Sequence, residues 1–122
     1  MLDVIYDQLL ISITERIDND YKNRYFIALS GPPASGKSTI SEKLANDLSA
    51  KDYNTSILQM DGFHYDDLIL KEKKLLLKKG APETFDVMGL INFVSRLQKE
   101  DEVVIPIFDR SLELSRSSAV II

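Results

Sequence analysis

Residues 31–38 of the chain read Gly31-Pro32-Pro33-Ala34-Ser35-Gly36-Lys37-Ser38. Glycine adopts backbone angles that other residues resist, so the two glycines let successive amide groups crowd around an anion. The lysine is placed to reach the β- and γ-phosphates of a nucleotide, and the serine hydroxyl to ligate Mg²⁺. ATP and Mg²⁺ are therefore the expected cofactors, with Ser38 as the metal ligand. The expected nucleotide contacts are Gly31, Ala34, Ser35, Gly36, Lys37, Ser38 and Thr39.

The flanks of this loop have the context that a phosphate-binding loop requires. The run Tyr25-Phe26-Ile27-Ala28-Leu29 is continuously apolar, which is typical of a strand covered on both faces. After the loop, apolar residues at helical spacing predict a helix that begins near Lys37, and its positive end would point at the same anion. The alternative, a glycine turn with an accidental lysine, does not account for this context.

Helices and strands are expected to alternate along the rest of the chain. The expected helices cover residues 2–17, 68–79 and 87–97, and the charged run Asp18-Asn19-Asp20 ends the first. The expected strands cover residues 55–60, 103–108 and 119–122. Pro106 places the middle one at a sheet edge or a bulge, because proline cannot donate to the ladder. This alternation predicts one α/β domain over residues 1–122.

Composition bounds the function classes. With 44% hydrophobic and 28% charged residues, the 122-residue chain is neither disordered nor fibrous in type. The absence of cysteine excludes disulfides, thiolate zinc sites and cysteine nucleophiles. A formal charge of −4 gives no broad attraction to nucleic acid or anionic membranes, and no apolar run approaches the roughly 20 residues that span a bilayer. We expect a soluble cytoplasmic protein without nucleic-acid or membrane partners.

Asp61 follows the strand expected at 55–60, at the sheet edge where open α/β folds bind ligands. A carboxylate there could orient a substrate hydroxyl, accept its proton late in transfer, or hold Mg²⁺ through water. The structural alternative is a turn aspartate before Gly62. His64 is the single histidine, which excludes a histidine metal cluster; it either contacts substrate or packs within a loop.

Three further charged positions also have structural alternatives. Lys79 belongs to a lysine-rich helix whose charges are usually solvated, although it could lie near phosphate. Asp86 could cap the helix that follows it. Arg116 follows the strand at 103–108 and could pair with acidic neighbours such as Glu113.

Four blocks of residues together suggest a family. They are residues 31–38, Met60-Asp61-Gly62-Phe63-His64, Lys79-Gly80-Ala81-Pro82-Glu83-Thr84-Phe85-Asp86 and Pro106-Ile107-Phe108-Asp109-Arg110-Ser111. In this order and spacing they resemble the nucleoside/nucleotide kinase-like P-loop family related to uridine kinase, bacterial pantothenate kinase and phosphoribulokinase. The resemblance covers about residues 24–118, and some members of the closest group are labelled fructose-transport-associated kinases.

This resemblance implies a three-layer αβα P-loop fold with a mainly parallel sheet. It also implies an ATP-dependent transfer of the γ-phosphoryl group to an alcohol of a small metabolite, such as a nucleoside, a sugar or a pantothenate-like acceptor. Lys37 and Asp61 would be the catalytic residues, with Asp61 as the base, and Asp86 would contact the acceptor sugar. Residues 106–116 resemble a hairpin that closes over the acceptor, bringing Phe108, in place of a tyrosine common in uridine kinases, and Arg116 to it.

The sequence departs from this family at its end. Members continue into a core strand with an acidic Walker-B-like residue, beside the phosphate-loop strand, and then into a mobile lid with arginines. Neither is found before residue 122, so we expect a truncated form with a gap in its sheet. Its expected partners are a second copy or a missing C-terminal half. The alternative function is a regulatory nucleotide-binding module without turnover.

Overall fold

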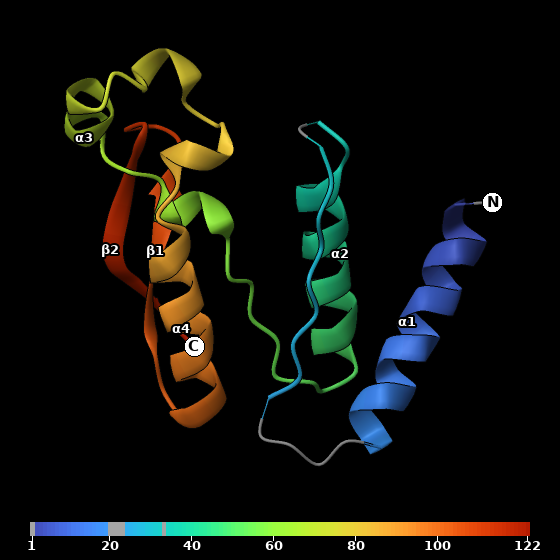
Figure 1. The fold of residues 1–122 in the computed structure, drawn as a ribbon. Coiled ribbons are helices and arrows are strands. Elements are labelled where there is room, and N and C mark those ends of the chain that lie inside the picture. The colour runs from blue at the N-terminus through green and yellow to red at the C-terminus, as the bar shows by residue number, and fades with distance from the viewer. Residues whose placement is uncertain (1, 20–23, 33) are drawn as a thin grey trace. The chain divides into compact units, whose positions relative to one another are not determined.

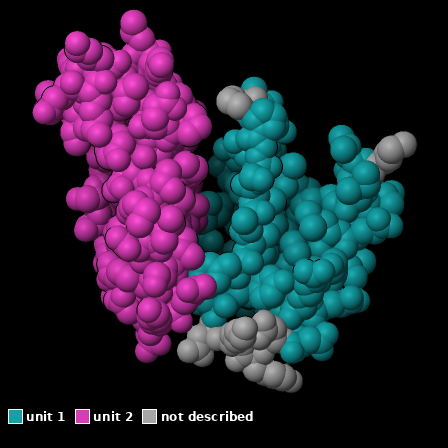
Figure 2. All heavy atoms as spheres, in the orientation of Figure 1, with its two compact units in different colours: residues 1–57 teal, residues 58–122 magenta. Residues whose placement is uncertain are grey.

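The computed structural model describes residues 2–19, 24–32 and 34–122, and these form two compact units (Figure 2). The first unit comprises residues 1–57 and the second comprises residues 58–122. Contacts concentrate within each unit, and the single domain expected over residues 1–122 stays a prediction. Each unit has its own small apolar core.

Two helices make up most of the first unit (Figure 1). They are α1, Leu2–Asn19, and α2, Lys37–Ala50, which confirms both helices expected in this region. Ile13 of α1 is buried against Leu44 and Leu48 of α2, and Leu10, Ile17 and Tyr53 surround this cluster. Asp20, expected at the end of the first helix, lies outside the described residues.

Two tyrosines add polar links between parts of the first unit. The Tyr6 hydroxyl donates to Asp47 Oδ2 at 2.5 Å, and the Tyr53 hydroxyl donates to Asp18 Oδ1 at 2.5 Å. Partial burial, together with the bond to Asp47, raises the pKa of Tyr6 to about 12. Both phenols therefore remain donors at neutral pH, which keeps α1 tied to the segments around α2.

The strands expected at residues 25–29 and 55–60 are not formed. Residues 25–29 and 55–59 have neither helix nor strand assignment. No backbone hydrogen bond joins residues 25–29 to any other residue that the structure describes, and Tyr25, Phe26, Ile27 and Leu29 are 37%, 44%, 39% and 39% exposed. A strand exists only where a neighbour pairs with its backbone groups, which apolar composition alone cannot supply. The expected mainly parallel sheet is thus absent from the described residues.

The second unit contains two α-helices and three 3₁₀ turns. The helices are α3, Asp67–Glu72, and α4, Val87–Lys99. The turns are η1, Met60–Phe63, η2, Leu76–Lys78, and η3, Pro82–Thr84. The helix expected at 87–97 is confirmed. The one expected at 68–79 stops early, because Lys74 adopts a left-handed φ of 58° and the Leu75 amide turns back to donate to the Leu70 carbonyl at 2.7 Å.

An antiparallel hairpin completes the second unit. It pairs β1, Val104–Asp109, with β2, Leu114–Ile121, so the strand expected at 103–108 is confirmed and the one expected at 119–122 begins earlier, at Leu114. The pairing is irregular at Pro106, where β1 advances from Ile105 to Ile107 while β2 runs from Val120 to Arg116. The bulge expected from this proline is therefore present.

The hairpin packs on α4 through the core of the second unit (Figure 1). Val103 and Ile105 are each 1% exposed and contact Leu97 of α4, with Leu58, Phe93 and Ile122 around them. This contact fixes the beginning of β1. None of the helices in the described part of the chain combines the length and apolar character needed to cross a membrane.

Candidate functional site

The phosphate loop closes directly onto the start of α2. Gly36 precedes the helix with a φ of 87°, a left-handed angle that glycine adopts without the steric cost of a side chain. Its carbonyl accepts from the Ile40 amide at 3.0 Å, and no side chain caps the helix. The first amide groups of α2 therefore meet no side-chain acceptor, which leaves the positive end of a 14-residue helix available to an anion.

Lys37 lies along the same loop. Its ammonium group donates to the Gly31 carbonyl at 2.6 Å, and a side chain at Gly31 would come within 2.9 Å of Ser35 Oγ. Ser35 and Ser38 lie exposed beside it. The structure thus brings the expected nucleotide contacts, Ala34 and Thr39 included, into one turn and one helix start; Pro33 of the motif lies outside the described residues.

In the second unit, the Asp61 and Asp86 blocks are joined by main-chain hydrogen bonds. The Tyr65 amide donates to the Thr84 carbonyl at 2.9 Å, and the Asp86 amide donates to the Phe63 carbonyl at 2.7 Å. His64 forms an isolated antiparallel bridge with Phe85 between these bonds. Two blocks that are separated in the sequence therefore form one continuous scaffold.

The hairpin packs against this scaffold. Ser115 of β2 donates its hydroxyl to the His64 carbonyl at 3.3 Å. Gly62 is buried against β1, where an added Cβ would lie 2.7 Å from the Pro106 carbonyl oxygen and 3.2 Å from Ile107 Cα. The Asp61 turn and the hairpin can approach this closely only because residue 62 has no side chain.

We expect Gly62→Ala to destabilise the second unit. Both close contacts are main-chain atoms that cannot rotate away, so the turn and the strand must separate, at a cost of about 1–3 kcal/mol. Denaturant unfolding followed by circular dichroism measures this cost. An unchanged midpoint would show that the turn does not pack on Pro106 as described.

An open hollow of about 290 Å³ surrounds Asp61. Its lining residues are Asp61, His64, Lys79, Gly80, Phe108, Arg110 and Glu113. The Asp61 side chain is 49% exposed, and its Oδ2 lies 3.8 Å from a guanidinium nitrogen of Arg110, too far for a direct hydrogen bond. The carboxylate is thus held near a positive charge while remaining accessible from the hollow.

His64 belongs to the scaffold and also lines the hollow. Its ring lies 3.9 Å, between centroids, from Phe85 and 5.3 Å from Phe108. Burial lowers the pKa of His64 below its ordinary value, although the nearby charge of Asp61 acts in the opposite direction. The imidazole is therefore neutral at physiological pH and contributes an aromatic surface rather than a positive charge.

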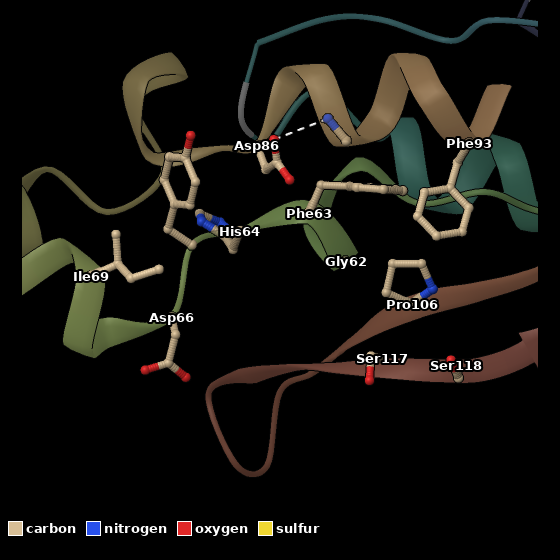
Figure 3. Close-up of a pocket in the computed structure, with 12 residues that line it drawn as sticks. Gly62, Phe63, His64, Asp66, Ile69, Asp86, Phe93, Pro106, Ser117 and Ser118 are labelled. Atoms are coloured by element: carbon tan, nitrogen blue, oxygen red, sulfur yellow. Dashed lines mark hydrogen bonds between the residues drawn. The ribbon is translucent and has the colours of Figure 1, made fainter. Parts of the chain in front are cut away.

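Asp86 lies on a different cavity, of about 300 Å³, which His64 also lines (Figure 3). Asp86 stands at the beginning of α4, and its Oδ1 accepts from the Gly89 amide at 3.0 Å (Figure 3). Phe63 and Phe93 pack edge to face beside it, with 5.4 Å between centroids. Asp86 therefore forms the helix cap that the sequence offered as an alternative. Asp61 does not line this cavity.

Two substitutions separate the cap from an acceptor contact at Asp86. Asp86→Ala removes the cap and is expected to cost about 0.5–2 kcal/mol of stability, whereas Asp86→Asn keeps an accepting oxygen and most of that stability. If Asp86 also contacts an acceptor, Asp86→Asn will raise the acceptor KM while the unfolding midpoint stays near that of the parent. Equal acceptor KM values in the parent and in Asp86→Asn would contradict the acceptor contact.

Arg116 lies away from the Asp61 hollow. It pairs with Ile107 across the ladder, so it lies on the face of the hairpin opposite Phe108. Its guanidinium is 3.7 Å from Asp109 Oδ2, an ion pair of the kind given as the structural alternative, but with Asp109 rather than Glu113. A hydrogen bond from the Ser111 hydroxyl lowers the pKa of Asp109 and keeps it ionised. Of the expected acceptor residues, the structure joins Asp61, His64 and Phe108.

Lys79 was expected either on a solvated helix face or near phosphate, but its side chain is only 23% exposed and its ammonium lies 3.0 Å from Asp67 Oδ1. It also donates to the main-chain carbonyl of Glu113 at 3.1 Å. Its place just before Gly80, where the lysine-rich segment ends, was the one signal that set it apart.

Comparison with known proteins gives a consistent set of relatives. The family described as chromatin associated protein KTI12 matches residues 26–107. Pantothenate kinases of Streptococcus pneumoniae serotype 19F (strain G54) and Enterococcus faecalis (strain ATCC 700802 / V583) are 36% and 33% identical over 90 and 91 residues. These matches cover 72% of this chain but 29% and 30% of the relatives, so the chain matches less than a third of their length.

A solved structure agrees with them. The crystal structure of a chain named as a fructose transport system kinase from Silicibacter sp. TM1040 superposes with a TM-score of 0.88 at 39% sequence identity. The match covers 96% of this chain and 57% of that one. This likeness shows the α/β fold of P-loop kinases.

Proposed function

The chain belongs to the family described as chromatin associated protein KTI12, a P-loop kinase-like family, and we propose that it supplies the ATP-binding and acceptor-binding parts of a small-molecule kinase. The reaction is transfer of the γ-phosphoryl group of ATP to an alcohol of a small metabolite. The family description mentions chromatin, but a net charge of −4 gives the chain no broad attraction for nucleic acid. The proposal therefore rests on the kinase relatives and on the geometry of the two half-sites.

The observation that carries the nucleotide half is the left-handed Gly36 leading into an uncapped helix beside Lys37. Amide groups at the start of α2 would bind phosphate oxygens, and Lys37 would move from the Gly31 carbonyl to the β- and γ-phosphates. Ser38 would hold Mg²⁺. Together ATP and Mg²⁺ supply the phosphoryl group and the charge that neutralises the phosphates.

Asp61 carries the acceptor half. From the open hollow its carboxylate can accept a hydrogen bond from a substrate hydroxyl, align it for attack and take its proton late in transfer. Neutral His64 and Phe108 offer aromatic surface to the body of the acceptor. Because phosphoryl transfer passes through a loose transition state, most of the acceleration would come from this positioning.

A nucleotide-binding module without turnover is the second candidate. It rests on the phosphate loop and the uncapped start of α2, which can bind a nucleotide without providing a transfer step. Such a module would keep the phosphate loop and bind Mg-ATP without transferring its phosphoryl group.

Two measurements distinguish these candidates. Thermal unfolding with and without Mg-ATP reports binding, because a ligand that binds only the folded state raises the transition temperature. Product formation with nucleosides, sugars and pantothenate reports transfer. A Mg-ATP shift with product supports the kinase, and a shift without product supports the module. No shift would overturn both.

A further inference from the structure

The hairpin that carries Phe108 and Arg110 is anchored differently at its two ends. At its base, Val103 and Ile105 are buried in the core, and Gly62 lies against Pro106. At its tip, residues 110–113 are all exposed, and the Arg110 side chain is 80% exposed. No core contact therefore fixes the tip, although it lines the Asp61 hollow.

Within the tip, the amides of Ser111 and Leu112 donate to Asp109 Oδ1 at 3.0 and 3.2 Å, and Lys79 joins the tip to the rest of the unit. The Lys79 ammonium donates to the Glu113 main-chain carbonyl at 3.1 Å and lies 3.7 Å from Glu113 Oε2. It is also 5.5 Å from the centroid of the Phe108 ring, within cation–π range. Glu113 has a left-handed φ of 53°, which is costly for a residue with a side chain and needs support from its surroundings. A charge-assisted hydrogen bond to its carbonyl supplies that support.

Lys79 is held from its other side by α3. Asp67 Oδ1 lies 3.0 Å from the ammonium and is buried, and it has no hydrogen-bond partner among the described residues besides this ion pair. The ammonium is thus shared between a carboxylate on the helix and a carbonyl on the hairpin tip. Through these two oxygens Lys79 makes tertiary contacts, in contrast to the exposed lysines beside it.

We propose that Lys79 is a positioning residue of the acceptor site, which holds the hairpin tip over Asp61 by bridging Asp67 and Glu113. Its importance for an acceptor rests on the proposed kinase function, but the bridge itself does not. Arg110 of the tip and Phe108 at the adjoining end of β1 line the hollow, so loss of the bridge leaves Asp61 intact while the wall opposite it moves. Acceptor binding then weakens more than nucleotide binding.

Hydrogen exchange on the 122-residue chain tests the bridge without any assay of activity. In Lys79→Met, which keeps the apolar stem but cannot donate, amides of residues 110–114 are expected to exchange about tenfold faster, as loss of one charge-assisted bond implies. Trypsin cleavage after Arg110 should accelerate in parallel. Amides of the buried segment 103–105 should stay protected.

Matched variants isolate the cause. Lys78→Met makes the same change at the neighbouring exposed lysine, whose side chain makes no ion pair or hydrogen bond with the described residues, and should leave exchange unchanged. Glu113→Gln should retain the protection, because Lys79 binds the main-chain carbonyl. Lys79→Met combined with Asp67→Asn removes the charge that Lys79→Met leaves without its partner, while the tip stays released. This double variant separates release of the tip from general destabilisation.

The possible results distinguish the bridge, the positioning role and the kinase function. Unchanged exchange at 110–114 in Lys79→Met, or an equal increase throughout the second unit that Asp67→Asn does not reverse, would overturn the bridge. Where product formation is detected, Lys79→Met should raise the acceptor KM about tenfold and leave the KM for ATP unchanged. Faster tip exchange with an unchanged acceptor KM would overturn the positioning role alone. Exchange that behaves as expected in a chain without turnover would count against the kinase function and not against the bridge.

Discussion

Lys37→Ala is expected to abolish phosphoryl transfer, with a loss of at least about a hundredfold in kcat/KM, the scale seen when one charge-stabilising donor is removed from a catalytic site. The ammonium already lies on the loop, bound to the Gly31 carbonyl at 2.6 Å, and is the one side-chain cation that the motif places near the phosphates. Without it, the β- and γ-phosphates lose their balancing charge. Isothermal titration with Mg-ATP and a product assay measure the two consequences.

Lys51→Ala is the matched control. Lys51 follows α2 at its far end and is exposed, so its removal changes the charge of the first unit equally without touching the loop. Mg-ATP should bind this variant as it binds the parent. Equal affinity in Lys37→Ala and the parent would contradict the assignment of residues 31–38 as the nucleotide site.

Asp61→Asn is expected to separate binding from chemistry. The amide is nearly the same size but cannot accept a proton, so turnover should fall by about a hundredfold to ten-thousandfold, the usual contribution of a general base. Mg-ATP affinity should be unchanged, because the proposed nucleotide contacts belong to residues 31–39. Single-turnover kinetics with saturating nucleotide would measure the chemical step directly.

Two comparisons make this result specific. Glu72→Gln removes one charge from an exposed position of α3 and should retain full turnover. Asp61→Asn also removes the ion pair with Arg110, so its unfolding midpoint should be measured beside the kinetics; an exposed pair of this kind contributes little stability. An Asp61→Asn protein with parental turnover would refute the base assignment.

Local patterns predicted much of the fold. The apolar spacing in residues 2–17 and after Lys37 predicted helices because each buries one stripe, and the structure packs those stripes together around Ile13 and Leu44. Pro106 predicted the bulge because a missing amide is a property of the residue itself. Asp86 predicted a cap from a local property as well, because its carboxylate can reach the amide of Gly89, three residues further along the chain.

What depends on distant partners was not predictable. Residues 25–29 have the composition of a buried strand, but no described residue pairs with them. Lys79 meets Glu113 from 34 positions away, and no periodicity in the sequence encodes that contact. Arg116 was expected near the acceptor, yet its register with Ile107 places it on the opposite face of the hairpin. Register is a property of two strands together and cannot be read from either alone.

The bare apolar stretch at residues 25–29 has a practical consequence for anyone who handles the 122-residue chain. The main-chain groups beside Phe26 and Ile27 have no main-chain partner among the described residues, so this exposed apolar segment favours edge-to-edge association as concentration rises. Purified material should therefore be kept dilute and checked by light scattering before any binding titration. Otherwise aggregation will lower the measured binding, and the loss will be mistaken for the absence of a nucleotide site.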